Sequence, residues 1–148
     1  MLVNSEDFDL LRHPKADLHQ KAADGQTCLH KAITYNTNNL KPVVFLIEKG
    51  LDINAVSENG MTPLMQSLDY NCNDVACFLI DQENVDLNAI NAYGFAAIHY
   101  AARNEDVKTL CRLLAAKADA IVRNHQNETF FDLLSDFNKK LFRTFAKQ

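Results

Sequence analysis

The sequence predicts an all-α protein built by stacking copies of one short unit, and two recurring motifs indicate this. The clearest copy of the first motif is NGMTPLM, at residues 59–65. Three weaker copies begin at Asp24, Tyr93 and Gln126, so that successive copies lie 35, 34 and 33 residues apart. A near-constant period of this length is typical of proteins in which neighbouring units share one hydrophobic core.

The second motif closes each unit and stays in phase with the first. It reads VFLIEKGLDINA at residues 44–55 and LCRLLAAKADA at residues 110–120. The copy between them, at residues 76–89, has one extra residue near Glu83 and Asn84. Because two separate motifs keep the same phase over three units, chance does not account for the pattern.

Together the two motifs resemble the ankyrin repeat, whose signature is a T-P-L-H-x-A core followed by V-x-x-L-L-x-x-G-A-D-x-N-A. The resemblance covers three full repeats and a degenerate fourth copy. It implies an all-α solenoid of stacked helix-turn-helix units with β-hairpin-like loops. It also implies one domain, residues 1–148, made of an N-terminal cap at 1–21, repeats at 22–56, 57–90 and 91–123, and a C-terminal capping repeat at 124–148.

Local signals place the helices within each repeat. Thr27, Thr62 and Thr129 can cap a helix with their hydroxyl groups, and Pro63 fits the first helical position because it has no N–H to leave unpaired. The expected first helices are 27–35, 63–70 and 97–104, and the expected second helices are 42–49, 74–81 and 107–116. Large apolar residues on these helices form the expected core: Leu64, Leu79, Ile98 and Leu113.

Special backbone positions complete the fold prediction. The loop glycines Gly25, Gly60 and Gly94 supply a positive φ that other residues adopt only at a cost. Asn127 replaces the glycine in the last copy and tolerates the same conformation. Lys117 stands where the second helix usually ends on glycine, so we expect it to cost about 1 kcal/mol if it takes up a left-handed conformation.

Both ends of the chain carry apolar segments that can close the stack. Residues 5–11 predict a short helix that presents Phe8, Leu10 and Leu11 inward and stops before Pro14. The C-terminal segment holds five of the nine phenylalanines, and its apolar residues follow the three- and four-residue spacings of an amphipathic helical hairpin. We interpret this segment as a cap, with an exposed partner-binding helix as the alternative.

Composition and charge exclude several classes of function. A chain of 148 residues with 47% hydrophobic content is long enough for one core. The net charge of -4 argues against nucleic acid as a partner, since phosphate binding needs clustered Lys and Arg. No apolar run is long enough to span a membrane, and the first residues lack the features of a signal peptide. We therefore expect a cytoplasmic monomer that binds neither membranes nor cofactors.

The four cysteines, Cys28, Cys72, Cys77 and Cys111, show neither a C-x-x-C pair nor the spacing of a metal site. They fall inside helical patterns, which favours buried, reduced thiols over a disulfide framework. This pattern predicts a reducing compartment.

The residues that could support catalysis have structural explanations. His30 and His99 hold the fourth position of the repeat core, where the resemblance implies a histidine that bridges backbone groups of adjacent repeats. The sequence contains no nucleophile elbow, zinc-protease helix, P-loop or dinucleotide-binding motif. We therefore expect no catalytic residue, no metal site and no enzymatic activity.

The resemblance also implies where a partner binds: in the concave groove and on the hairpin tips. Aromatic and arginine side chains there are the types that dominate interface energies. We expect Tyr70, Tyr93 and Phe95 to form one continuous exposed aromatic patch beside Arg103, which could orient an acidic group of the partner. The full set of candidate partner-binding residues is Gln26, Tyr35, Glu58, Met61, Tyr70, Tyr93, Phe95, Arg103 and His125.

These observations predict a protein–protein interaction module whose partner is another protein. Two alternatives stay open: a secreted bacterial or viral effector that binds a host protein in the eukaryotic cytosol, and a regulatory subunit that docks an enzyme through the phenylalanine-rich C-terminal segment. Asn54 lies in a setting that resembles the asparagine hydroxylation sites of eukaryotic ankyrin repeats. It is therefore a candidate modification site, with an unmodified structural asparagine as the alternative.

Overall fold

The structure is a computed structural model that describes residues 17–35 and 38–145, so the helix expected at residues 5–11 lies outside the described part. All regular secondary structure in the described part is helical. An inner row consists of α2 (Cys28–Tyr35), α4 (Pro63–Asp69), α6 (Ala97–Arg103) and α8 (Phe130–Leu133). An outer row consists of α3 (Leu40–Glu48), α5 (Asn73–Ile80) and α7 (Val107–Ala115), and α9 (Asp136–Phe145) follows at the C-terminal end.

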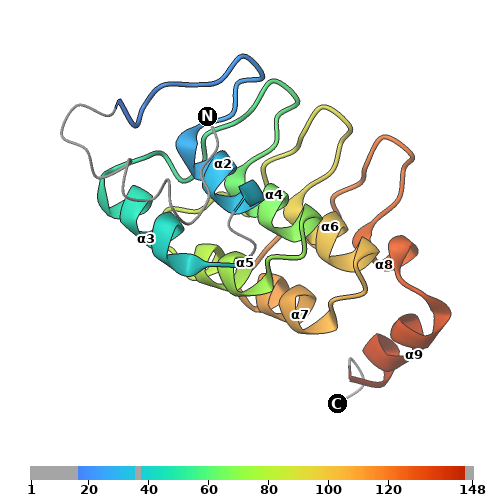
Figure 1. Ribbon diagram of the computed structural model, residues 1–148. Coiled ribbons are helices and arrows are strands. Elements are labelled where there is room, and N and C mark those ends of the chain that lie inside the picture. Colours follow the sequence, from blue (N-terminus) through green and yellow to red (C-terminus); the bar gives the residue numbers. More distant parts are fainter. Residues whose placement is uncertain (1–16, 36–37, 146–148) are drawn as a thin grey trace.

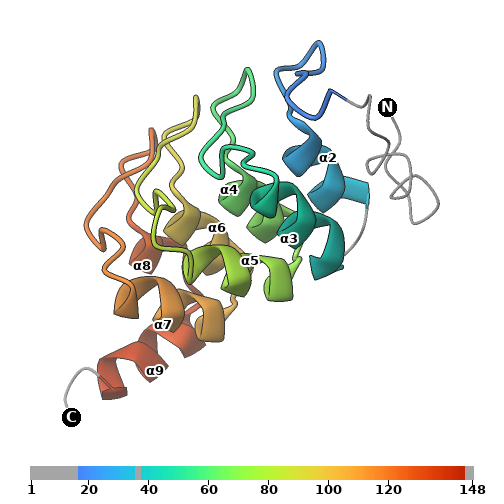
Figure 2. The same ribbon diagram turned by 90° about the vertical axis from the view of Figure 1, so that its left-hand side faces the viewer.

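The two rows run side by side along a stack of helix pairs, as Figures 1 and 2 show from two directions. Long loops project from the stack to one side, at the top of Figure 1, and we call them the fingers. The predicted solenoid of helix-turn-helix units is confirmed, and the helix boundaries agree closely with the expected ranges.

The helices begin and reverse at residues suited to those places. Thr62 caps α4 through its hydroxyl oxygen, and Asn39 caps α3 through its side-chain carbonyl. In the described part of the chain, a left-handed residue lies between the inner and outer helix of each full pair. These residues are Asn38, Asn71 and Glu105, with φ of 65°, 56° and 56°.

Left-handed backbone also occurs at the positions that the sequence predicts. Gly25, Gly60 and Gly94 have φ of 73°, 73° and 79°, and Asn127 has 64° in the last finger. Lys117 has φ of 66°, so the expected strain at the end of α7 is present.

One hydrophobic core runs along the stack between the two rows. Leu64, Leu79, Ile98 and Leu113 are each no more than 1% exposed, which confirms the predicted core positions. They belong to a single buried cluster that includes residues of every full repeat, so each repeat is stabilised by its neighbours.

Buried histidines bridge two of the three junctions between repeats. The Nδ1 atom of His30 accepts the N–H of Thr27 at 3.2 Å, so Nε2 carries the proton and donates to the carbonyl of Met61 in the next repeat at 2.8 Å. His99 makes the equivalent contact, with Nε2 3.2 Å from the carbonyl of Glu128. The predicted structural role of these histidines is confirmed.

The middle junction has Met65 in the histidine position and is bridged by other side chains. The amide nitrogen of Asn91 donates to the hydroxyl of Tyr100 at 2.8 Å. That hydroxyl donates in turn to the sulfur of Met61, in the preceding repeat, at 3.2 Å. A phenol and a thioether therefore replace the imidazole at this junction.

A second set of contacts joins the loops that follow the outer helices. The side-chain oxygen of Asn54 accepts the N–H of Asp86 at 2.7 Å, and its amide nitrogen donates to the carbonyl of Asn84 at 2.7 Å. Asn88 accepts the N–H of Asp119 at 2.8 Å in the same way one repeat later. These asparagines fix the spacing of the loops.

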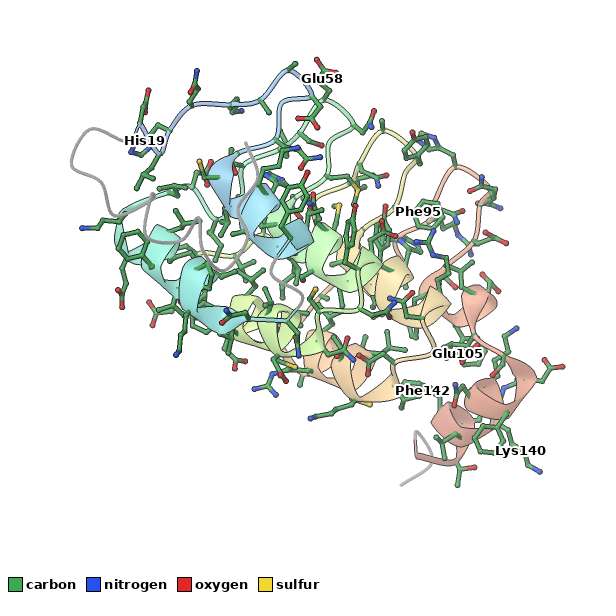
Figure 3. The ribbon with its side chains drawn as sticks, viewed as in Figure 1. His19, Glu58, Phe95, Glu105, Lys140 and Phe142 are labelled. Atoms are coloured by element: carbon green, nitrogen blue, oxygen red, sulfur yellow. The ribbon has the colours of Figure 1, made fainter. Side chains whose placement is uncertain are left out.

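The C-terminal helix is attached through Glu105 and through aromatic contacts. The carboxylate of Glu105 accepts the backbone N–H of Ser135 at 2.6 Å and also bonds to the side chain of Asn138. The ring of Phe142 lies 6.2 Å from that of Phe130 in α8. Figure 3 labels Glu105 and Phe142 where the end of the stack meets α9.

Candidate protein-binding face

The fingers are four loops, at residues 22–26, 57–61, 91–95 and 124–128, and each is closed by backbone pairing. The N–H of the first residue donates to the carbonyl of the last at 2.8–3.1 Å in every finger. One further backbone bond joins neighbouring fingers, such as Glu58 N–H to the carbonyl of Asp24 at 3.0 Å. The expected β-hairpin-like loops are confirmed, and they form one continuous row.

The glycines of the fingers are required by close approach as well as by their φ. A Cβ atom on Gly94 would lie 2.7 Å from the backbone nitrogen of His125, and one on Gly25 would lie 2.8 Å from that of Glu58. Since these neighbouring atoms are backbone, they cannot yield by a change of rotamer. A side chain at either position would push adjacent fingers apart.

Three tyrosines are the most exposed aromatic residues near the fingers and inner helices. Tyr35, Tyr70 and Tyr93 are 42%, 53% and 57% exposed. Tyr70 follows the C-terminal end of α4, whereas Tyr93 lies in the third finger, which leads into the N-terminal end of α6. Tyr70 thus flanks the C-terminal ends of the inner helices and Tyr93 their N-terminal ends, and α4 and α6 are neighbours in the inner row. The continuous exposed patch of Tyr70, Tyr93 and Phe95 stays a prediction.

Phe95 and Met61 lie in the third and second fingers and are half-buried, which corrects the expectation that such side chains stand clear of the core. The ring of Phe95 packs 5.5 Å from the imidazole of His99 and 5.6 Å from the ring of Tyr100. Met61 receives the hydroxyl of Tyr100. Both positions follow the finger glycine, where a large apolar side chain folds back onto the next helix.

Arg103 makes more contacts within the stack of repeats than its sequence position predicts. Its guanidinium carbon lies 4.9 Å from the ring centroid of Tyr100 and 5.8 Å from that of Phe95. The same guanidinium forms a 2.6 Å ion pair with Asp69 of the preceding repeat. Its charge is therefore matched within the chain, although half of the side chain stays accessible to a partner.

The remaining candidates lie on the first, second and fourth fingers. Glu58 and His125 are exposed, and Figure 3 shows Glu58 among the fingers at the edge of the molecule. Gln26 is half-buried and lines a cavity of about 240 Å³ at the N-terminal end of the described chain. The structure thus brings the candidates to one face, the fingers together with the inner helices, but spreads them over its whole length.

Asn54 is half-buried and lies away from this face, in the loop after α3. Both polar atoms of its side chain are used in the contacts with Asn84 and Asp86. The structural alternative therefore has a physical basis. Hydroxylation stays a prediction, which the intact mass of protein recovered from a eukaryotic cytosol would test as one added oxygen.

Burial controls the titration of the groups that line the junctions. Desolvation lowers the pKa of His30 and of His99, so both imidazoles are neutral at pH 7. Burial also raises the pKa of the Tyr100 hydroxyl, which stays protonated and can donate to Met61. At pH 7 the polar groups at these junctions are therefore two neutral imidazoles and one protonated phenol.

The cysteines are all free, but they are not all buried. Cys28 and Cys72 are buried, Cys77 is half-buried and Cys111 is exposed on α7. The prediction of a buried thiol is wrong for Cys111, because its helical position faces solvent rather than the neighbouring row.

Within residues 17–35 and 38–145, no group of three or more His, Cys, Asp or Glu side chains is arranged to hold a metal ion. No helix in these ranges is long and apolar enough to cross a membrane.

Sequence reasoning missed two buried residues that link the third repeat to the second finger beneath this face, Tyr100 and Asn91. A signal was present, because Asn91 and Asn124 occupy the same place in consecutive fingers and each accepts two backbone N–H groups of its own finger. The contact between Asn91 and Tyr100 depends on packing between a finger and a helix, which the linear motif does not specify.

Comparisons with known proteins agree with this geometry. A family model described as "Ankyrin repeats (3 copies)" matches residues 3–91. Alpha-latrotoxin-Lg1a of Latrodectus geometricus is 31% identical over 123 residues, which cover 82% of this chain and 9% of the toxin. The B-cell lymphoma 3 protein homolog of Mus musculus is 33% identical over 115 residues, which cover 76% of this chain and 25% of the relative.

An ankyrin repeat-containing protein of Schizosaccharomyces pombe is 31% identical over 114 residues, covering 74% of this chain and 52% of the relative. The chain thus spans between 9% and 52% of the length of these three relatives. Ankyrin repeats are generally protein–protein interaction modules, a non-catalytic use of the fold. The matched motifs, the stacked helix pairs and the bridging histidines lead to one conclusion: the chain belongs to the ankyrin-repeat family.

Proposed function

We propose that the chain binds another protein through the face formed by the fingers and the inner helices, and that it has no catalytic role. The observation that carries the proposal is the exposure of Tyr70 and Tyr93, each more than half accessible to solvent. An exposed tyrosine contributes nothing to the core, whereas in an interface it supplies large contact area at little entropic cost.

The anchors of this proposed interface are two separate regions. One is Tyr70 with the Asp69–Arg103 pair beside it, at the C-terminal ends of α4 and α6. The other is the finger row, with Tyr93 flanked by Glu58 and His125. A partner that contacts both regions spans the length of the inner helices, which favours a folded domain over a short peptide.

Photo-crosslinking tests this function directly. A photoreactive phenylalanine analogue replaces Tyr70 or Tyr93, and the control carries it at Lys108, an exposed residue on α7. The expected result in a eukaryotic cytosolic lysate is the same adduct from both tyrosine positions and none from Lys108. Equal adducts from all three positions would assign the contacts to nonspecific collisions.

We also place this binding in the cytosol, because four free thiols favour a reducing compartment. This setting fits both an endogenous adaptor and an effector delivered into a host cell. Fractionation of cells that produce the chain at native levels would separate the two: an effector leaves the producing cell, whereas an adaptor stays inside it.

A second binding mode has one specific observation in its favour. Phe137 on α9 is 76% exposed, although Glu105 and Phe142 anchor that helix. This supports the alternative in which the C-terminal segment docks an enzyme. Phe137→Ser would then abolish capture of the partner while leaving thermal stability unchanged, and the Tyr70→Ala variant would capture it normally.

A further inference from the structure

A cavity of about 530 Å³ lies between the loops that close the first two repeats, after α3 and α5. It is outside the face proposed above, because its walls come from the loops that follow the outer helices. Ile47 and Ile53 contribute apolar surface, and Asp52 and Glu83 contribute carboxylates. The volume is within the range of small-ligand sites.

The extra residue of the second repeat lies in the wall of this cavity. The insertion near Glu83 and Asn84 lengthens the loop after α5, and both residues line the cavity. On the opposite wall, Gly50 has open space where a Cβ atom would stand, since no heavy atom lies within 4 Å of that position. The inserted residue thus lengthens the loop on one side of the cavity, and the glycine on the other side places no side chain in it.

The walls are held in place by hydrogen bonds. Asn54 donates to the carbonyl of Asn84 at 2.7 Å and accepts from Asp86 at 2.7 Å, which ties the two loops together. The side chain of Gln82 donates to the carbonyl of Phe78 at 2.9 Å. The cavity is therefore a fixed feature of the two loops rather than a gap between loose segments.

The described residues that line the cavity include two carboxylates and no basic side chain. One oxygen of Asp52 accepts the N–H of Asn54 at 2.9 Å, which aims the carboxylate and leaves its second oxygen available. Asp52 and Glu83 are exposed, and neither forms an ion pair with any residue that the structure describes. The nearest lysine in sequence, Lys49, has its ammonium group over the ring of Phe45 at 5.4 Å.

We propose that this loop cavity is a binding site for an alkyl-guanidinium or alkyl-ammonium group, as carried by arginine or lysine. The aliphatic stem would lie against Ile47 and Ile53, and the cation would sit between the carboxylates of Asp52 and Glu83. Long cationic side chains combine an apolar stem with a charged head, so a cavity lined by both isoleucine and carboxylate side chains offers contacts to both parts. The proposal stands independently of the finger face.

The test is a titration of the full chain with acetyl-arginine methylamide, monitored by the ¹⁵N amide chemical shifts of the protein. Acetyl-citrulline methylamide is the matched control, because it has nearly the same shape without the charge. We expect saturable shifts at Gly50, Asp52 and Glu83 with the arginine probe and much weaker ones with citrulline. Added salt should reduce the affinity, because the carboxylates are exposed.

Charge-removing variants sharpen the test. The double variant Asp52→Asn and Glu83→Gln should weaken arginine binding about three- to tenfold, while the asparagine oxygen can still accept the N–H of Asn54. Asp119→Asn removes the carboxylate that holds the equivalent turn in the third repeat, outside this cavity, and should leave binding unchanged. Thermal melts check that all variants are folded.

Butylguanidinium separates the two sources of such a group. Tighter binding of the arginine probe identifies a peptide side chain as the occupant, and equal binding identifies a free organic cation. Deletion of Glu83 provides a second variant, which should shrink the cavity and abolish binding in a chain that still melts cooperatively. Shifts that do not saturate, equal responses to citrulline, or full affinity in the double variant would overturn the proposal.

Discussion

The junctions between repeats differ in how they satisfy the same need. At the first and last junctions an imidazole links the start of one inner helix to the next finger, from His30 to Met61 and from His99 to Glu128. At the middle junction Met65 has no such group, and Tyr100 reaches back to Met61 instead. Each of the three junctions thus has a side chain that forms a polar link between repeats, and this side chain need not be a histidine.

The junctions also differ in which repeat supplies the linking side chain, and this changes the residues near the binding face. A histidine link starts in the preceding repeat and is almost completely buried. The tyrosine link starts in the following repeat and brings Phe95 and Arg103 together with Tyr100. The middle junction therefore combines two aromatic rings with the half-exposed guanidinium of Arg103.

The largest expected effect tests whether the apolar core is shared by both kinds of junction. Leu79 is completely buried in α5, between the histidine-linked and the tyrosine-linked junctions. We expect Leu79→Ala to cost about 2–5 kcal/mol of stability, because it removes buried methyl groups and leaves a cavity. Denaturant melts measure this, with the exposed Lys108→Ala as control. An unchanged midpoint for Leu79→Ala would contradict the assigned register.

The next effect contrasts the two residues found in the histidine position. His30→Leu should cost about 2–3 kcal/mol, because the N–H of Thr27 and the carbonyl of Met61 both lose a buried partner. Met65→Leu, at the same place in the next repeat, should cost less than about 1.5 kcal/mol, since it conserves volume and the Met65 side chain makes no hydrogen bond to the described residues. Equal losses would show that packing, and not the polar link, explains the histidine.

A smaller effect isolates the substitute link at the middle junction. Tyr100→Phe removes only the hydroxyl that joins Asn91 to Met61, so we expect a loss of about 1 kcal/mol. Tyr93→Phe is the matched control, because that hydroxyl lies on an exposed finger and should be neutral. Similar results for both variants would mean that the tyrosine link does not stabilise the junction.

The most gradual effect is the dependence of stability on pH. Burial lowers the pKa of His30 and His99 below the ordinary value of 6.5, so the unfolded chain binds protons more readily than the folded one. The contribution of the neutral imidazoles is complete above pH 6.5 and is lost as the pH falls from there through the lowered values. Melts between pH 7.5 and about 5 should show this decline, and His30→Leu should flatten it. An unchanged slope in that variant would assign the decline to other groups.

The fold followed from the sequence because its determinants are local and periodic. The helix boundaries, the buried position of Leu79 and the positive φ of Asn127 each depend on residues within one repeat and on the phase of the repeat. The histidine links were also predictable, because the motif fixes both the donor residue and the finger that accepts from it.

The candidate site was less predictable because exposure depends on side-chain direction. Phe95 occupies a finger position that is exposed in a linear reading, yet its ring turns inward to His99. Tyr70 and Tyr93 are close in repeat order but are separated by the length of an inner helix. The charge of Arg103 is matched by Asp69, a pairing between repeats that no motif encodes.

The left-handed backbone of Lys117 affects how many further destabilising substitutions the third repeat can tolerate. Gly50 takes the equivalent place in the first repeat with φ of 82°, whereas Lys117 holds φ of 66° with a full side chain. A conformation that costs roughly 1 kcal/mol persists only in a protein whose remaining contacts keep it above the threshold for folding. The strain at Lys117 uses part of the margin above that threshold, so we expect the third repeat to tolerate further destabilising substitutions less well, and Lys117→Gly to raise the free energy of unfolding by roughly 1 kcal/mol.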